Sequence, residues 1–329
     1  MAIPPELAAA LERILAEGRP VSIEEVNALM QAEVQRYNSR PQRELGGLSP
    51  EALYHLLHGD WRTTGSLRIA EDVPGDLVRD VPFVADARSL LEYVAEHEPV
   101  KLTAAGYLPR AAMLALVPRL RIPQHPGLPN APIGKAPKEL DYPWLELIRA
   151  TTSYAGLISE RGRLRLLKKG RTMLAESKSG ALYALLLRTL FRQVDLFALF
   201  AVDGYDALQQ TLAYTLYRLP LVARDWTPVE DIVAACWLET AREEPELEVH
   251  ALGDLFVAAF QQRVLDPLEQ FGLVERRVGD GPSAWLDEGE YRITELYERV
   301  VRVDVGTASP VRTVSSGKPA LKVVRGRAR

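Results

Sequence analysis

Residues 268–300 read LEQFGLVERRVGDGPSAWLDEGEYRITELYERV and belong to the most informative part of the sequence. Apolar side chains recur at helical spacing from Leu255 to Phe271. Gly272 follows directly, and glycine readily takes the left-handed conformation that ends a helix. The stretch therefore opens with a helix that stops at Gly272.

Two extended segments and a second helix are predicted after this stop. Residues 273–278 are strand-like, Gly279-Asp280-Gly281 is a turn sequence, and a second extended run ends at Ile293. Thr294 is placed to cap the helix that follows. Helix, hairpin and helix in this order resemble the second half of winged-helix domains. The resemblance rests on Leu268, Phe271, Gly272, Leu273, Val274, Tyr291, Ile293 and Thr294.

A shorter version of the same order occurs earlier in the chain. The pattern predicts a helix over 142–154 that ends at Gly156, a hairpin over 157–167 that turns at Gly162, and a helix over 168–174. This segment is interpreted as a second winged helix with a minimal wing.

The two hairpins differ in charge. Residues 158–178 carry seven basic and two acidic side chains, a net charge of +5. Guanidinium groups suit phosphate oxygens, so these residues are the predicted nucleic-acid contact. A solvated hairpin face is the commoner cause of such a charge run and remains the alternative. The predicted binding residues are Arg161, Arg163, Arg165, Lys168, Lys169 and Arg171. In the later hairpin, Arg276 and Arg277 are offset by acids, so it is expected to bind phosphate poorly.

The N-terminal 65 residues read as helices joined by turns. Ser22 and Glu25 form a capping-box pattern, and Ser49 precedes Pro50 at the start of another helix. Residues 37–50, YNSRPQRELGGLSP, resemble a segment of an uncharacterised bacterial family and the short connector near the end of integrase-type transposases. The same bacterial family has a Leu-Thr, Gly, Leu-Pro phrase like that of residues 102–109. No catalytic residue is carried over from either resemblance.

The proline pattern of residues 121–141 predicts a stiff linker. Pro123, Pro126, Pro129 and Pro132 recur every third residue, as on one face of a polyproline II helix. A proline-motif docking site is the alternative.

The domains expected from these boundaries are an N-terminal helical domain (1–120), the linker (121–141), a helical domain with the minimal winged helix (142–250), a winged-helix-like domain (251–305) and a basic tail expected to be disordered (306–329). The predicted fold class is mostly α, with small β-hairpins.

Composition excludes several protein classes. The net charge of −4 and pI of about 5.9 leave nucleic-acid binding to a local patch, and no apolar run predicts a membrane span or a signal peptide. A single cysteine, Cys236, excludes an internal disulfide framework and, in an apolar context, reads as a core residue. We therefore expect a cytoplasmic bacterial protein that does not bind membranes.

No catalytic or cofactor motif stands out. The sequence contains no phosphate loop, dinucleotide fingerprint or nucleophile elbow, so we predict no cofactor and no catalytic residue. His55, His58 and Asp60 lack a further ligand, so no metal is predicted.

The acidic run over 226–249 is interpreted as a solvated surface or as a contact for a basic partner. Three functions follow in order of preference: nucleic-acid binding, with DNA as the partner; protein interaction; and an enzyme whose site no motif reveals.

Overall fold

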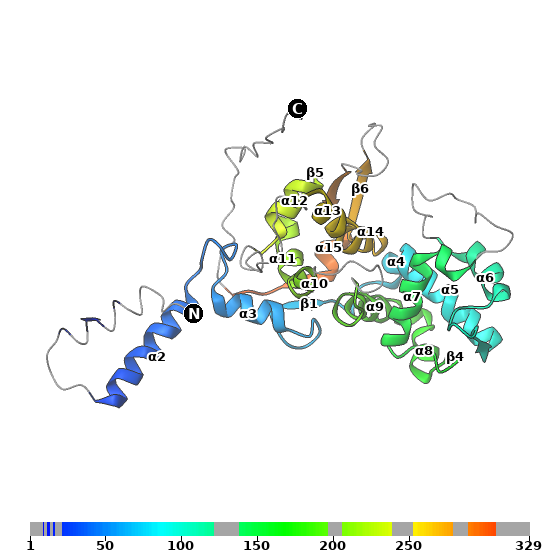
Figure 1. Ribbon diagram of the computed structural model, residues 1–329, viewed down its shortest axis with the longest axis horizontal. Helices are drawn as coiled ribbons and strands as arrows, with labels where there is room; N and C mark the ends of the chain where they lie inside the picture. The colour runs from blue at the N-terminus through cyan, green and yellow to red at the C-terminus, as the bar shows by residue number, and fades with distance from the viewer. Residues whose placement is uncertain are drawn as a thin grey trace, which may run out of the picture.

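The computed structural model describes residues 22–121, 138–196, 206–238, 253–278 and 289–306, together with four isolated positions nearer the N-terminus. Helices dominate the described residues, and short strands pair into antiparallel sheets (Figure 1). The predicted fold class, mostly α with small β-hairpins, is confirmed.

The N-terminal helices begin where their capping residues predict. Helix α2 (Ile23–Ser39) starts at a capping box in which the Ser22 side chain accepts the Glu25 N–H and the Glu25 carboxylate accepts the Ser22 N–H. Helix α3 (Pro50–His58) is capped by Ser49. Helix α2 projects from the body of the molecule at the left of Figure 1.

The first packed unit combines helices with a three-stranded sheet. Strand β4 lies between β2 and β3 and is antiparallel to both, while α5 packs on α7 and β4. Helix α8 (Lys168–Met173) follows the sheet. In chain order the unit contains α5 (Pro82–His97), β2 (Val100–Lys101), α6 (Arg110–Leu116), η1 (Val117–Arg119), η2 (Glu139–Asp141), α7 (Pro143–Tyr154), β3 (Ile158–Ser159) and β4 (Arg163–Leu166).

The second unit repeats this order of elements. Strand β7 lies between β5 and β6, so the last strand of the unit again occupies the centre of its sheet. Gly272, with φ +68°, ends the long helical stretch before the hairpin, as predicted. The unit contains α11 (Leu212–Val222), β5 (Thr227–Pro228), α12 (Val229–Cys236), α13 (Gly253–Phe260), the π-helical turn η6 (Gln261–Leu265), α14 (Asp266–Gln270), β6 (Val274–Val278) and β7 (Gly289–Ile293).

The remaining elements join the two units. Strand β1 pairs with β8, which brings the chain near residue 68 against the chain near residue 302. Thr294 caps α15, as predicted. These joining elements are β1 (Leu67–Ile69), α4 (Gly75–Val78), η3 (Glu176–Lys178), α9 (Ser179–Gln193), α10 (Asp206–Gln210), α15 (Glu295–Val300) and β8 (Val301–Val303).

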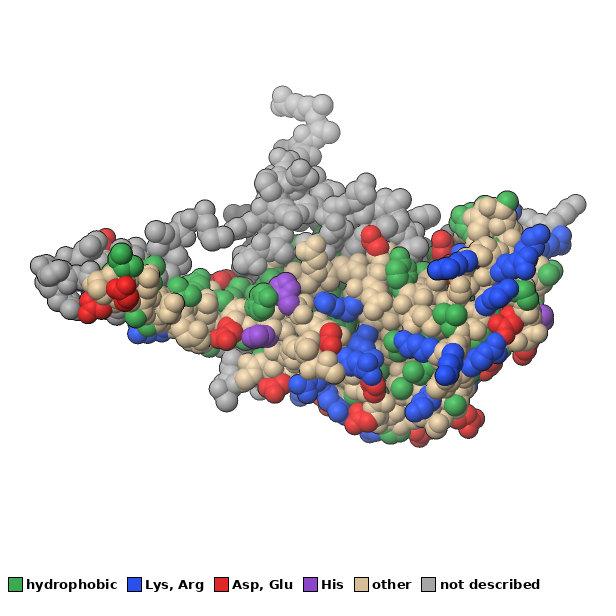
Figure 2. Space-filling view, turned by 90° about the horizontal axis from the view of Figure 1, so that it is seen from below, with side chains coloured by type: hydrophobic (Ala, Val, Ile, Leu, Met, Phe, Trp, Pro, Cys, Tyr) green, Lys and Arg blue, Asp and Glu red, His purple; other side chains and the backbone are tan. Residues whose placement is uncertain are grey.

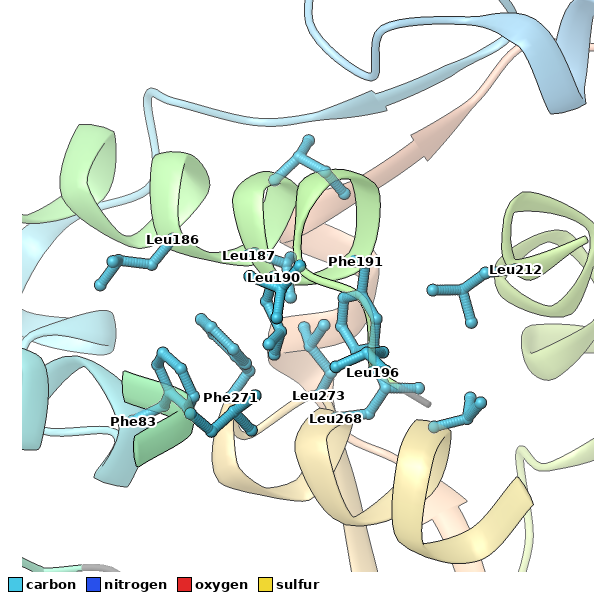
Figure 3. Close-up of a cluster of buried hydrophobic side chains, with 14 of the residues drawn as sticks. Phe83, Leu186, Leu187, Leu190, Phe191, Leu196, Leu212, Leu268, Phe271 and Leu273 are labelled. Atoms are coloured by element: carbon cyan, nitrogen blue, oxygen red, sulfur yellow. The ribbon is translucent and has the colours of Figure 1, made fainter. Parts of the chain in front are cut away.

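One continuous core runs through both units. Phe83 of α5 stacks on Phe271, which follows α14, with ring centroids 4.5 Å apart, and Leu187 and Leu190 of α9 lie over them in the cluster of Figure 3. Tyr183 of α9 donates its hydroxyl hydrogen to the Phe271 carbonyl at 2.8 Å. Helix α9 therefore supplies the surface on which the two units meet.

Elements on both sides of the predicted linker, residues 121–141, pack on each other. Strand β2 precedes this segment and pairs with β4, which follows it. The Asp86 carboxylate accepts the Arg121 N–H at 2.6 Å, and the Glu139 carboxylate accepts the Leu108 N–H at 2.7 Å. Strand pairing across the segment therefore joins its two flanks into one packed unit; the prolines lie outside the described residues, and the predicted domain boundaries remain a prediction.

Several predictions lie outside the described residues. They include the prolines at 123–137, the acidic residues from 239 onward, and the basic tail beyond residue 306. Among the helices that are described, none combines the length and apolar character needed to cross a membrane.

Candidate nucleic-acid interface

The β3–β4 hairpin turns its cations outward. Gly162 takes φ +68° at the tip, a conformation that suits glycine in a tight turn. Leu164 and Leu166 of β4 are buried, whereas Arg163 and Arg165 between them are exposed. This alternation is the period of two of a strand with one buried face, so both arginines lie on the solvent face.

The six predicted contact residues are all exposed, but their surroundings differ. Within the described part of the chain, Arg161, Arg163 and Lys168 form no ion pair. Lys169 donates from Nζ to the Ala155 carbonyl at 2.8 Å, and Arg171 forms an ion pair with Glu98. The hairpin cations therefore remain available to a ligand, while Arg171 is already partly neutralised.

Glu98 is the acid that holds α8 and β4 together. Its carboxylate accepts a hydrogen bond from Arg171 and another from the Leu166 N–H at 2.9 Å. These two donors lower the pKa of Glu98, and the charge of Arg165 adds a smaller effect in the same direction. Glu98 is thus ionised and offsets one of the cations nearby.

The fold adds cations that the local sequence did not indicate. Lys101 of β2 lies directly opposite Arg163 in the sheet register. Burial lowers the pKa of Lys169, and the positive charges of Arg62 and Arg188 lower it further. Figure 2 shows Lys and Arg side chains gathered over the right half of the face seen from below. The basic surface is therefore assembled from distant segments, and no spacing in the sequence could have shown it.

Helix α7, which precedes the basic hairpin, offers little to a ligand. Six of its twelve residues are buried, among them its only arginine. Its one cation, Arg149, is buried between two carboxylates: Nε lies 2.6 Å from Glu139 Oε1, and Nη1 lies 3.4 Å from Glu160 Oε2. Burial raises the pKa of Glu160, and the Arg149 charge opposes that rise. The arginine of α7 is therefore part of the interior of the unit.

The hairpin of the second unit is internally neutralised. Arg277 pairs with Glu290, and Arg292 pairs with Glu275, across the β6–β7 register. Both guanidinium groups also lie against the Trp226 ring, with carbons 4.8 and 4.5 Å from its centroid. Each cation on this face already has an acidic and an aromatic partner.

Gly170 sets how closely α8 approaches the hairpin. A Cβ at this position would lie 2.4 Å from the Leu157 carbonyl oxygen. Gly170→Ala is therefore expected to displace α8 and lower the free energy of unfolding by about 1–3 kcal/mol, as overpacking does. Urea unfolding followed by circular dichroism would measure the loss. Thr172→Ala, at an exposed position of the same helix, should change stability by less than about 0.5 kcal/mol; an equal loss in both variants would contradict the steric explanation.

The remaining candidates from the sequence occupy structural positions. Cys236 is buried, and burial raises the pKa of its thiol to about 12, which leaves no thiolate at neutral pH. The Asp60 carboxylate accepts backbone N–H groups from Arg62, Thr63 and Thr64. The Asp60 carboxylate therefore serves to hold its own loop through these hydrogen bonds.

The segment that carries the basic hairpin matches a protein family. Residues 79–179 match the model of the Y4jL N-terminal domain, a range that begins just before α5 and ends at the first residue of α9. The match covers about a third of the chain and includes the phrase at 102–109, but not the motif at 37–50. No curated protein and no solved structure shows a significant match to the chain. The matched range coincides with the first unit and crosses the proline-rich segment.

Proposed function

We propose that this chain is a cytoplasmic bacterial protein that binds nucleic acid through the phosphate backbone, with the β3–β4 hairpin and α8 as the contact surface. The observation that carries the proposal is the unpaired charge on the outward face of the hairpin, where Arg163 and Lys101 lie side by side. Phosphate contacts supply most of the affinity of such proteins and require no base recognition.

We further propose that both units are winged helices. Each unit runs helix, strand, helix, helix and hairpin, and in each sheet the last strand lies between the other two. That order and that sheet arrangement are typical of winged-helix domains. The hairpin of each unit then corresponds to the wing, and α7 corresponds to the helix that usually enters the major groove.

The buried state of α7 favours binding with little sequence preference. A recognition helix reads base edges through exposed polar side chains. Arg149 is held between Glu139 and Glu160, so α7 lacks an exposed arginine for this task. We therefore expect affinity for duplexes of different sequence to vary much less than affinity at different salt concentrations.

A charge-reversal pair tests the proposal. Arg163→Glu with Lys168→Glu should weaken binding to a fluorescein-labelled random-sequence duplex by at least about tenfold. The slope of log Kd against log salt should also become shallower by about 2, because each lost phosphate contact removes about 0.9 from it. Fluorescence anisotropy at several salt concentrations measures both quantities.

The matched control carries the same change in net charge elsewhere. Arg43→Glu with Arg299→Glu alters two exposed arginines that lie off the hairpin and α8, and it should retain most of the affinity. Equal weakening by both pairs would indicate general electrostatic attraction in place of a defined surface. Absence of salt-dependent binding by the unmodified protein would refute the proposal.

Protein interaction is the second candidate, and the second unit favours it. Its hairpin face is neutral because Arg277 and Arg292 are each paired with a glutamate. A complex that persists after nuclease treatment and is lost with Trp226→Ala, while Arg163→Glu has no effect on it, would favour this function over nucleic-acid binding.

A further inference from the structure

Three cations from separate segments meet beside α8. Arg62 lies in the loop after α3, Lys169 in α8 and Arg188 in α9. Arg62 Nε is 2.9 Å and Arg188 Nη2 is 2.7 Å from the same oxygen, Glu71 Oε1. Both guanidinium charges reach Lys169 strongly enough to lower the pKa of its ammonium group, after the larger effect of burial. Two guanidinium groups thus share one carboxylate oxygen, and the Lys169 ammonium group lies near enough to be influenced by both of their charges.

The loop that carries Arg62 is held rigidly. Asp60 Oδ1 accepts the N–H groups of Arg62, Thr63 and Thr64 at 2.8–2.9 Å. Trp61, between Asp60 and Arg62, has φ +59°, an unfavourable conformation for a bulky side chain, and its ring is almost fully buried. The position of Arg62 is therefore determined by the packing of its neighbours and not by its own ion pair.

The donors in this cluster match the acceptors of a phosphodiester. Arg62 is largely exposed and presents a guanidinium fork, a geometry that pairs with two phosphate oxygens. Lys169 uses one of its three N–H groups on the Ala155 carbonyl and has two more to donate. Glu71, with 37% of its side chain exposed, occupies the place of an anion between the two arginines. A phosphate group would meet the same donors that Glu71 now meets.

We propose that Arg62, Lys169 and Arg188 bind a backbone phosphate of nucleic acid, as a second contact point beyond the hairpin. The inference rests on the proposed function and extends the contact from β4 across α8 to the loop after α3. Lys169 of the cluster follows Lys168 of the proposed hairpin surface in α8, which begins two residues after β4. Glu71 acts as an internal competitor for the incoming phosphate.

Two substitutions with opposite expected effects test this site. Arg62→Gln should weaken binding of the random-sequence duplex about threefold to tenfold and make the salt slope shallower by about 1, because one phosphate contact is lost. Glu71→Gln should strengthen binding by a similar factor, because it removes the competing carboxylate while retaining an amide of the same size. A merely structural role for Glu71 would not produce tighter binding. Arg43→Gln, an exposed arginine off this surface, is the control and should leave both quantities unchanged.

The outcomes separate this inference from the function on which it rests. If Arg62→Gln and Glu71→Gln both bind as the unmodified protein does, while the Arg163→Glu and Lys168→Glu pair binds weakly, the cluster is not a phosphate site and the proposed function stands. If the unmodified protein shows no salt-dependent binding, both are overturned. Circular dichroism melts of each variant identify any loss of affinity that comes from unfolding. Glu71→Gln remains decisive if Arg62→Gln unfolds, since weaker or unchanged binding by folded Glu71→Gln would overturn the cluster.

Discussion

Arg149→Met is expected to lower the free energy of unfolding by about 3–5 kcal/mol. The Arg149 side chain is 10% exposed, and the Glu139 side chain beside it is fully buried. Removing the guanidinium leaves the Glu139 carboxylate buried without its cation, and desolvation of an unpaired charge is what makes such a change costly. Glu160 and the Gly106 carbonyl lose a partner at the same time.

Equilibrium urea unfolding at neutral pH measures this loss, and a double variant identifies its cause. Arg149→Met with Glu139→Gln removes both buried charges, so it should recover much of the stability that the single variant loses. Arg36→Met removes an arginine from the exposed Arg36–Glu33 pair and should cost less than about 1 kcal/mol. A loss below about 1 kcal/mol for Arg149→Met, or a double variant that is as unstable as the single one, would show that the buried charge is not the source of the effect.

Local signals in the sequence predicted the ends of elements well. Three helices start at the predicted places, which are marked by Ser22 with Glu25, by Ser49 with Pro50, and by Thr294. Capping is a contact between residues a few positions apart, so its chemistry is fully visible in a short stretch. The β3–β4 hairpin, in which Ser159 pairs with Arg165, was predictable for the same reason.

Contacts between distant segments could not be predicted in this way. The prolines of residues 121–141 indicate a stiff segment, but they carry no information about β2 pairing with β4 on either side of it. Likewise, Arg149 reads as an ordinary helix cation until the fold brings Glu139 and Glu160 against it. The predicted basic surface contained Lys169, but not Arg62 or Arg188, because those residues come close to it only in the folded chain.

The packing between the two units should make them unfold together. Phe271 is fully buried; its ring stacks on Phe83 and meets Tyr183 edge-on, with centroids 5.4 Å apart. Phe271→Ala removes these contacts and leaves a cavity between α5 and α9, so it is expected to lower the free energy of unfolding by about 3–5 kcal/mol. Urea unfolding followed by circular dichroism measures the loss. Tyr54→Ala, at a position 60% exposed, should cost less than about 1 kcal/mol.

The shape of the transition distinguishes one cooperative core from two independent ones. Because Phe83 belongs to the first unit and Phe271 to the second, a single core predicts one transition for Phe271→Ala, shifted to lower urea with the same slope. Trp144 of α7 and Trp237, which follows α12, report separately on the two units when each in turn is the only tryptophan of the chain. Coincident fluorescence transitions from the two reporters support a shared core. The opposite outcome is a Phe271→Ala variant in which the Trp237 reporter unfolds first while the Trp144 reporter keeps the midpoint of the unmodified protein. That result would show that the second unit is an independent domain, held to the first by the Phe83–Phe271 stack without sharing its core.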